Sequence, residues 1–150
     1  MGKKKIFILI MCCILLGIST SCKTSQRASD GATIPYTVAN GYFIKNNITQ
    51  QPPIKITSKQ EFDSYFGAAA TMSEIPTDVD FTRQFVVAVS MPQTNTLTNL
   101  YPQSLKEKNG RLVFSYKVEN GKKQSYSMVP LMLIVIDKKY DAEVVPEKTN

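Results

Sequence analysis

Residues 85–91 read FVVAVSM and residues 131–136 read LMLIVI, and these two runs indicate the class of fold. The first lies between Arg83 and Pro92, and the second follows Pro130. Apart from Ser90, both consist of apolar residues, which is typical of strands that are covered on both faces. We therefore expect residues 85–91 to form the centre of a β-sheet and residues 131–136 to form a second covered strand.

The segment between these runs alternates, which predicts strands with one covered face. Asn109-Gly110 precedes residues 111–118 and Asn120-Gly121 follows them, and Asn-Gly is the dipeptide best suited to a two-residue type I′ hairpin turn. In residues 111–118 the apolar side chains share one side of an extended chain: Leu112, Phe114, Tyr116 and Val118. These signals predict a three-stranded antiparallel meander over residues 100–106, 111–118 and 123–128.

One short helix is predicted near the middle of the chain. Ser58 and Glu61 have the spacing of a capping box, and Gly67 is suited to a left-handed helix end. Three aromatic residues between them recur on one helical face: Phe62, Tyr65 and Phe66. The expected fold class is α+β, a single domain with an antiparallel sheet of about five to seven strands and one short helix. Short apolar stretches occur at residues 36–39 and 42–44. Further short strands are expected at residues 54–56 and 142–145, with Pro146 closing the last.

The first 22 residues have the pattern of an export signal. Three lysines at positions 3–5 precede the apolar residues 6–18, and small polar residues then lead to Cys22. An apolar helix of thirteen residues measures about 20 Å, short of the roughly 30 Å of a bilayer core, which favours a cleaved signal over a retained span. Loss of three lysines lowers the net charge from +6 to +3, the difference of 15 Lys and Arg and 12 Asp and Glu.

This signal resembles the lipobox of bacterial lipoproteins, because Ser21, a small residue, directly precedes Cys22 at the end of the apolar run. Ser19 stands where leucine is common. The resemblance implies a signal peptide over residues 1–21 and a Cys22 that carries diacylglycerol and an acyl chain such as palmitate. The chain is then expected in the cell envelope, anchored in the outer membrane of a Gram-negative bacterium and facing the periplasm or the surface. An ordinary cleaved signal is the alternative.

Residues 22–33 contain no large apolar side chain and predict a flexible tether, which leaves residues 34–150 as the folded domain. The chain has no histidine, and its three cysteines all lie at or before position 22. Histidine bases, thiolate nucleophiles and structural zinc sites are therefore not expected in the mature domain. Without a phosphate-binding glycine loop or a basic stripe, we also expect no cofactor, no metal and no nucleic acid partner.

Two groups of residues have to be weighed as candidates for catalysis. Glu74, Asp78 and Asp80 are the densest carboxylates, and they are interpreted as solvated loop residues rather than as a metal or catalytic site. Serines at 125 and 127 lie close in sequence to lysines at 122 and 123, and a Ser/Lys pair there competes with an ordinary exposed polar face. We expect no catalytic residue.

Residues 91–100, MPQTNTLTNL, are uncharged and follow the expected central strand. Polar loops carried by a rigid sheet are common places for partner contacts. A plain surface connector is the alternative interpretation of the loop. Residues 93–99 are also compatible with an exposed edge of the sheet. The predicted partner-contact loop consists of Gln93, Thr94, Asn95, Thr96, Leu97 and Thr98.

Residues 56–118 and the strands after them resemble the C-terminal domain family named for PrcB, a subunit of a secreted bacterial protease complex. The resemblance is carried by ITSKQEFDSYF (56–66), by VDFTRQFVVAVSM (79–91) and by YSMVPLMLIVI (126–136). Where members of that family often have a PTGGY-like loop, this chain has PQTNTLT (92–98). The resemblance implies a small non-catalytic domain that associates with envelope proteins such as proteases.

The sequence as a whole predicts a lipid-anchored envelope lipoprotein with a non-catalytic protein-binding domain, either protease-associated or protease-inhibitor-like. Two alternatives stay open at this point. One is a structural or stress-related surface lipoprotein without a dedicated partner. The other is a carboxylate-dependent enzyme built around Asp78 and Asp80.

Overall fold

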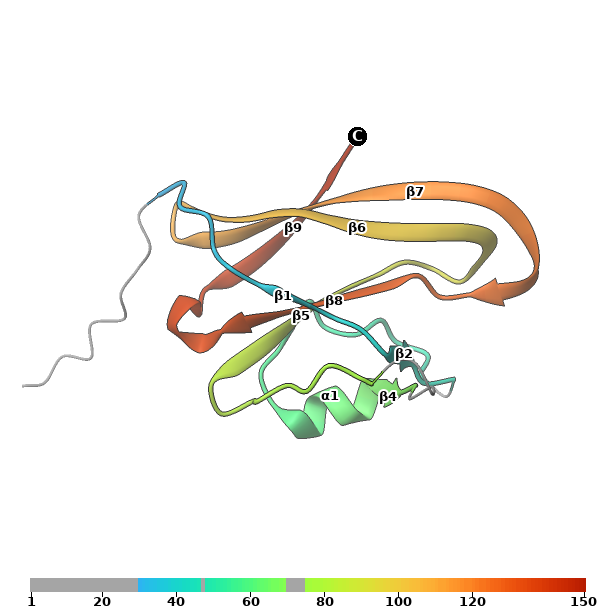
Figure 1. Ribbon diagram of the computed structural model, residues 1–150, viewed down its shortest axis with the longest axis horizontal. Helices are drawn as coiled ribbons and strands as arrows, with labels where there is room; N and C mark the ends of the chain where they lie inside the picture. Colours follow the sequence, from blue (N-terminus) through green and yellow to red (C-terminus); the bar gives the residue numbers. More distant parts are fainter. Residues whose placement is uncertain (1–29, 47, 70–74) are drawn as a thin grey trace, which may run out of the picture.

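A computed structural model describes residues 30–46, 48–69 and 75–150. These residues form sheets of four, two and three strands, almost entirely antiparallel, together with a single short α-helix, which confirms the predicted α+β class. Figure 1 shows three layers, with a hairpin sheet above, the four-stranded sheet in the middle, and the helix and the two-stranded sheet below.

The middle layer is the four-stranded antiparallel sheet. β5 and β8 pair along their whole length, from Gln84 opposite Asp137 to Ser90 opposite Leu131, and each has five consecutive buried residues. The prediction of two strands covered on both faces is therefore confirmed. The strand order is β1 (Thr37–Ala39), β8 (Leu131–Asp137), β5 (Gln84–Ser90) and β3 (Lys55–Ile56).

Two hydrophobic cores lie on opposite faces of this sheet, and alternate residues of β5 point into each of them. This division explains why residues 85–89 of β5 are apolar without interruption. The core toward the hairpin sheet includes Phe85, Val87, Val89, Ile134, Leu105, Leu112 and Phe114. The core toward the helix includes Val86, Ala88, Leu133, Val135, Ile56, Phe62 and Phe66.

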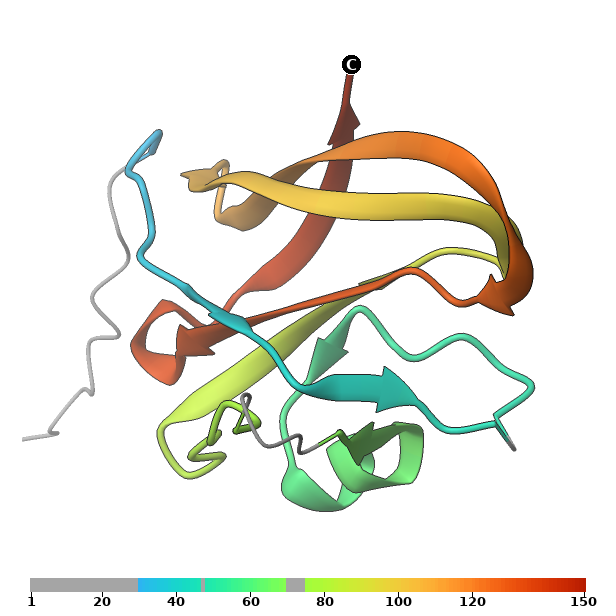
Figure 2. The same cartoon turned by 45° about the vertical axis from the view of Figure 1, so that its right-hand side comes forward.

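The upper layer is dominated by one long hairpin of β6 (Thr94–Lys108) and β7 (Arg111–Met128). Asn109 and Gly110 form its turn with φ values of 53° and 75°, as expected for a type I′ turn. Figure 2 shows the hairpin arching over β5 and β8. The first predicted Asn-Gly turn is thus confirmed.

The second predicted turn, at Asn120-Gly121, is wrong. β7 continues through this dipeptide, so the predicted meander of three strands is a single hairpin of two strands. Thr98 lies opposite Asn120 and Thr96 lies opposite Lys123, so two residues of β6 span three residues of β7. The dipeptide therefore marks a β-bulge, in which one strand carries an extra residue and bends.

The last strand, β9 (Glu143–Thr149), follows the 3₁₀ turn η1 (Lys138–Tyr140) and pairs with β7 in parallel. It is an edge strand, as expected, but Pro146 lies inside it rather than at its end. A proline is tolerated there because an edge strand needs hydrogen bonds on one side only.

The helix α1 (Lys59–Tyr65) begins at the predicted cap. Ser58 Oγ accepts the N–H of Glu61 at 3.2 Å, while the Glu61 carboxylate accepts the N–H of Thr57 at 3.4 Å rather than that of Ser58. The prediction that Gly67 ends the helix is wrong, because the chain is already extended at Phe66. Gly67 lies in β4 (Phe66–Ala68), paired with β2 (Tyr42–Ile44).

Gly67 has a packing role instead. A Cβ at this position would lie 2.5 Å from the ring of Phe43, so only glycine lets the ring cover the strand. The aromatic face of the helix packs as predicted, since Phe62 and Phe66 are buried and their ring centroids are 4.9 Å apart.

The hydrogen-bonded part of the chain begins upstream of Ile34. The N–H of Gly31 donates to Glu107 at 2.6 Å, and the N–H of Glu107 donates to Ala32 at 3.0 Å. Some residues assigned to the tether therefore pair with the end of β6. Among the described residues, no helix is long and apolar enough to cross a membrane.

Candidate functional site

The candidate site lies where the paired strands fold over. β5 and β8 are neighbours in the middle sheet, β6 and β7 are neighbours in the upper sheet, and the β5–β6 and β7–β8 connections lie at the same end. The first connection is Met91 to Gln93, and the second is Val129 and Pro130. The N–H of Met91 donates to the carbonyl oxygen of Pro130 at 3.0 Å, which holds the two connections together.

An irregularity in β7 opens space beside these connections. Thr94 lies opposite Met128, whereas Thr96 lies opposite Lys123, so two residues of β6 face five residues of β7. Together with the bulge at Asn120-Gly121, this mismatch bends β7 away from regular pairing. The strands therefore do not close over the end of the upper core.

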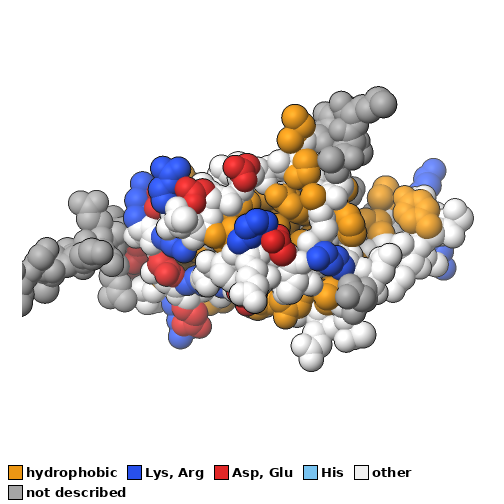
Figure 3. Space-filling model, turned by 90° about the horizontal axis from the view of Figure 1, so that it is seen from below, with side chains coloured by type: hydrophobic (Ala, Val, Ile, Leu, Met, Phe, Trp, Pro, Cys, Tyr) orange, Lys and Arg blue, Asp and Glu red, His pale blue; other side chains and the backbone are white. Residues whose placement is uncertain are grey.

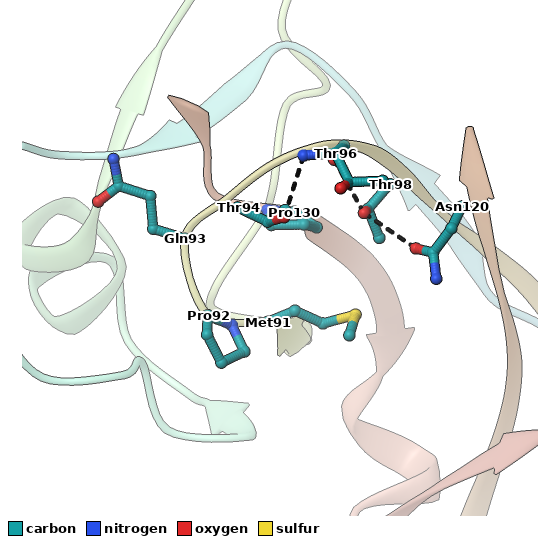
Figure 4. Close-up of a pocket in the computed structure, with 8 residues that line it drawn as sticks. All are labelled: Met91, Pro92, Gln93, Thr94, Thr96, Thr98, Asn120 and Pro130. Atoms are coloured by element: carbon teal, nitrogen blue, oxygen red, sulfur yellow. Dashed lines mark hydrogen bonds between the residues drawn. The ribbon is translucent and has the colours of Figure 1, made fainter. Parts of the chain in front are cut away.

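A cavity of about 340 Å³ occupies this position. Its size is within the range of small-ligand and side-chain pockets, about 300 to 1,000 Å³. Figure 4 shows Met91 and Pro92 together along one side, with Gln93 at the end far from Asn120. Its lining, which contains no charged side chain, consists of Met91, Pro92, Gln93, Thr94, Thr96, Thr98, Asn120 and Pro130.

The polar side of the pocket is held by local hydrogen bonds. Thr94 Oγ1 accepts the N–H of Thr96 at 3.1 Å, and Thr98 Oγ1 lies 3.0 Å from both the Thr96 carbonyl oxygen and the Asn120 amide oxygen (Figure 4). A hydroxyl has one proton, so Thr98 donates to one of these acceptors at a time. Thr98 is only 4% exposed, which fixes its position in the wall.

The structure places the predicted contact residues in two groups. Gln93, Thr94, Thr96 and Thr98 line the pocket, whereas Asn95 and Leu97 lie outside its lining. The loop interpretation is wrong, because β6 begins at Thr94 and its side chains alternate between the two faces, whereas the interpretation as an exposed edge is confirmed. A polar edge strand lacks the apolar alternation that identifies most strands in a sequence.

Sequence reasoning missed Asn120 as a wall residue of this pocket, since Asn-Gly was assigned to a turn. It also missed Pro130, which was read only as the boundary of the next strand. The one available signal was the uncharged interval of residues 124–136 around Pro130, and Asn120 had none of this kind. A second cavity of about 290 Å³ shares Met91, Pro92 and Gln93 and is completed by residues of the 44–52 segment and by Val129.

The carboxylates at Asp78 and Asp80 have separate environments. Asp80 accepts the N–H and hydroxyl of Thr82, at 2.9 and 2.5 Å, and pairs with Arg83 Nε at 2.7 Å. The Thr82 hydroxyl, the Arg83 guanidinium and the Thr82 N–H lower the pKa of Asp80 from 3.8 to about 2. The Asp80 carboxylate therefore stabilises the turn before β5. Glu74 lies outside the described residues.

Asp78 lines another cavity, of about 220 Å³, with Tyr42 and the ion pair Lys59–Asp63, and Asp80 is not part of that lining. Burial raises the pKa of Tyr42, and the Asp78 carboxylate raises it further. The Tyr42 hydroxyl donates to the Thr77 carbonyl at 2.6 Å. This geometry describes a structural tyrosine rather than an acid and base pair facing one another.

The remaining candidates lie apart from any such arrangement. Ser125 and Ser127 are exposed on β7. Among the described residues, no group of three His, Cys, Asp or Glu side chains could hold a metal. Seen from the side of α1, charges of both signs are scattered between hydrophobic side chains (Figure 3). Cys22 and the signal segment lie outside the described residues.

No model of a protein family, no curated protein and no solved structure matches the chain.

Proposed function

We propose that this chain is a lipid-anchored protein of the bacterial cell envelope whose α+β domain binds a partner polypeptide without catalysis. The binding site is the pocket between Met91 and Asn120. The signal ending at Cys22 supports the anchor, and the resemblance to the PrcB C-terminal domain family supports an envelope partner such as a protease. The observation that carries the binding role is the chemistry of the pocket wall.

That wall suits a peptide segment more than a charged small molecule. It combines an apolar side with hydroxyl and amide groups, and none of its side chains is charged. Charged ligands need charged or strongly dipolar partners, whereas a peptide offers N–H, C=O and apolar groups together. Met91 adds a flexible apolar side chain, a residue type that adapts to different occupants.

The binding mode follows from this wall. An apolar side chain of the partner enters between Met91 and Pro130, and its backbone exchanges hydrogen bonds with the hydroxyl groups along β6. Because Thr94 and Thr98 are already held by neighbouring groups, the wall is ordered before binding. Preorganisation of this kind lowers the entropic cost of association.

The sharpest test uses the alternation of β6. Thr96→Arg places a long charged side chain in the pocket, whereas Asn95→Arg places the same side chain on the exposed opposite face. Each variant is recovered from detergent-solubilised membranes with its bound proteins. We expect a partner in fixed ratio to the parent and to Asn95→Arg, reduced at least tenfold for Thr96→Arg.

A partner that is retained equally by both variants would exclude the pocket as its binding site. Absence of any partner from the parent would favour a structural or stress-related lipoprotein instead. Circular dichroism of the two variants controls for misfolding, since a substitution that unfolds β6 would lower binding trivially.

The anchor is tested separately by Cys22→Ala. This change removes the acylated thiol, so the protein should remain an unprocessed precursor without acyl mass. Intact mass spectrometry of the parent should show acyl additions on residue 22. A soluble parent with an unmodified thiol would overturn the anchor and leave the pocket proposal standing.

A further inference from the structure

β6 is an edge strand whose outer side is paired only near one end. One side pairs with β7, and on the other side Thr33 bridges Lys106 while the N–H of Ile34 donates to Leu105 at 2.8 Å. Among the described residues, no strand pairs with the outer side over residues 94–102. This edge therefore takes part in backbone pairing near Lys106, and no strand is paired with it over residues 94–102.

The open part lacks the features that normally protect an edge. Residues 94–101, TNTLTNLY, contain no charge and no proline, whereas charges, prolines and short strands are the usual means of preventing edge pairing. The edge strands of the middle sheet, β1 and β3, have three and two residues. The other edge of the hairpin sheet, β9, is protected by Glu143, Pro146, Glu147 and Lys148.

Pro102 shows which residues direct their backbone groups outward. Proline has no N–H, so in its pair with Tyr116 it occupies a position whose backbone faces away from β7. Positions alternate along a strand, and pairing is regular from Thr98 to Pro102. Leu100 and Thr98 therefore also direct their N–H and C=O groups away from β7, although only 4% of the Thr98 surface is exposed.

We propose that two copies of this chain associate through the outer edge of β6, antiparallel and about a two-fold axis at Asn99. In this register Thr98 lies opposite Leu100 of the second copy, and the reverse pair forms by symmetry. These are the residues whose backbone groups face outward, so they form reciprocal hydrogen-bonded pairs. The result is one continuous sheet in the order β9-β7-β6-β6-β7-β9.

The side chains of this register are self-complementary. Tyr101, which is 41% exposed, lies opposite Leu97 of the second copy, and this pair occurs twice. An aromatic side chain opposite an aliphatic one stabilises antiparallel strands. The two Asn99 side chains meet at the axis and carry no charge, so no like charges face one another. Pro102 lies opposite Thr96 twice and offers no donor to its carbonyl oxygen, but that oxygen lies 3.0 Å from the Thr98 hydroxyl of its own copy. The Thr96 N–H is likewise already donated, to Thr94 Oγ1.

This association leaves the proposed peptide pocket open. The pocket is lined by Thr94, Thr96 and Thr98, on the face of β6 opposite to Asn95 and Leu97, whereas the contact between copies runs along the strand edge. The dimer therefore does not depend on the proposed function, and each copy keeps its own pocket.

Cysteine cross-linking tests the register. In the full chain in its membrane, Asn99→Cys places two thiols in a directly opposed non-hydrogen-bonded pair, with Cα atoms about 4.5 Å apart. Asn95→Cys is equally exposed, but symmetry separates its two copies by eight residues along the strand, about 27 Å. Mild oxidation should give at least tenfold more disulfide-linked dimer for Asn99→Cys than for Asn95→Cys, and none for the parent.

Equal cross-linking at both positions would indicate random collision and overturn the proposal, as would no cross-linking at Asn99→Cys. A second pair of variants tests association without oxidation. Asn99→Lys places like charges directly opposite one another, whereas Asn95→Lys does not. Two differently tagged copies should co-purify in detergent for the parent and Asn95→Lys, with at least a fivefold loss for Asn99→Lys. Co-purification unaffected by Asn99→Lys would also overturn the register.

Discussion

Two neighbouring regions of the molecule differ sharply: the β5–β8 pair of the middle sheet, and the part of the β6–β7 hairpin that follows it in the upper sheet. β5 and β8 are paired without interruption and bury five consecutive residues each. β6 and β7 near Thr94 and Met128 are polar, interrupted by register shifts and partly exposed. Burial on both faces thus accompanies regular pairing, and the pocket lies where both are lost.

The difference shows how a strand can exist without a strand-like sequence. The beginning of β6 has no apolar alternation of its own and is extended because β7 lies beside it and β5 leads directly into it. Its side chains are therefore free to be polar and to line a pocket. Stability is expected to depend on the β5–β8 pair, and binding on the part of β6 and β7 near Thr94 and Met128. Mutations can test this difference.

The largest effect on stability is expected from Phe85→Ala in the β5–β8 pair. Phe85 has no exposed surface and packs in the core between the sheets, and loss of a buried phenylalanine costs about 3 to 5 kcal/mol. Tyr126→Ala is the matched control, because Tyr126 is 57% exposed on β7 and should change stability by less than about 0.5 kcal/mol. Urea denaturation measures both.

Comparable losses of stability from the two variants would contradict the difference between the buried β5–β8 pair and the exposed part of the β6–β7 hairpin. If Phe85→Ala does not fold, Phe85→Leu provides the same comparison with a smaller cavity. Its loss of stability should still exceed that of Tyr126→Ala clearly.

How much of this arrangement the sequence predicts depends on burial. The runs at 85–91 and 131–136 identify β5 and β8 because strands covered on both faces need apolar residues throughout. Ser58 locates the helix start for an equally local reason, its hydrogen bond to the N–H of Glu61. Asn109-Gly110 identifies the hairpin turn because that turn needs two positive φ values.

The features that failed depend on distant neighbours. Asn120-Gly121 has the same letters as the true turn, yet β6 pairs across it and converts it to a bulge. Gly67 faces a ring from another strand rather than ending a helix. The pocket itself combines Met91, Thr98 and Asn120 through these long-range pairings, so half of its wall was identified without its geometry.

A pair of glycine substitutions separates the turn from the bulge. Gly110 has a φ of 75°, and a side chain in that left-handed region costs about 1 to 2 kcal/mol. Gly121 is not in that region, and a Cβ there would lie 3.2 Å from a terminal carbon of Leu97, which can move. Gly110→Ala should therefore lower the denaturation midpoint clearly more than Gly121→Ala. The reverse order would indicate that residues 120–121 form a turn rather than a bulge.

The smallest effect on stability concerns Asp80, in the turn that precedes β5. Its pKa is lowered to about 2 by Thr82 and Arg83, so its ionised form is favoured in the folded state. A lowered carboxyl pKa stabilises the fold above the unfolded value of about 4, and that contribution disappears as the pH falls toward 2. Asp80→Asn should therefore have a lower Tm than the parent at pH 6, with the two values converging below pH 3. Two Tm curves that stay parallel from pH 6 to pH 2 would show that the carboxylate does not stabilise this turn. Packing alone would then hold the turn before β5 in place.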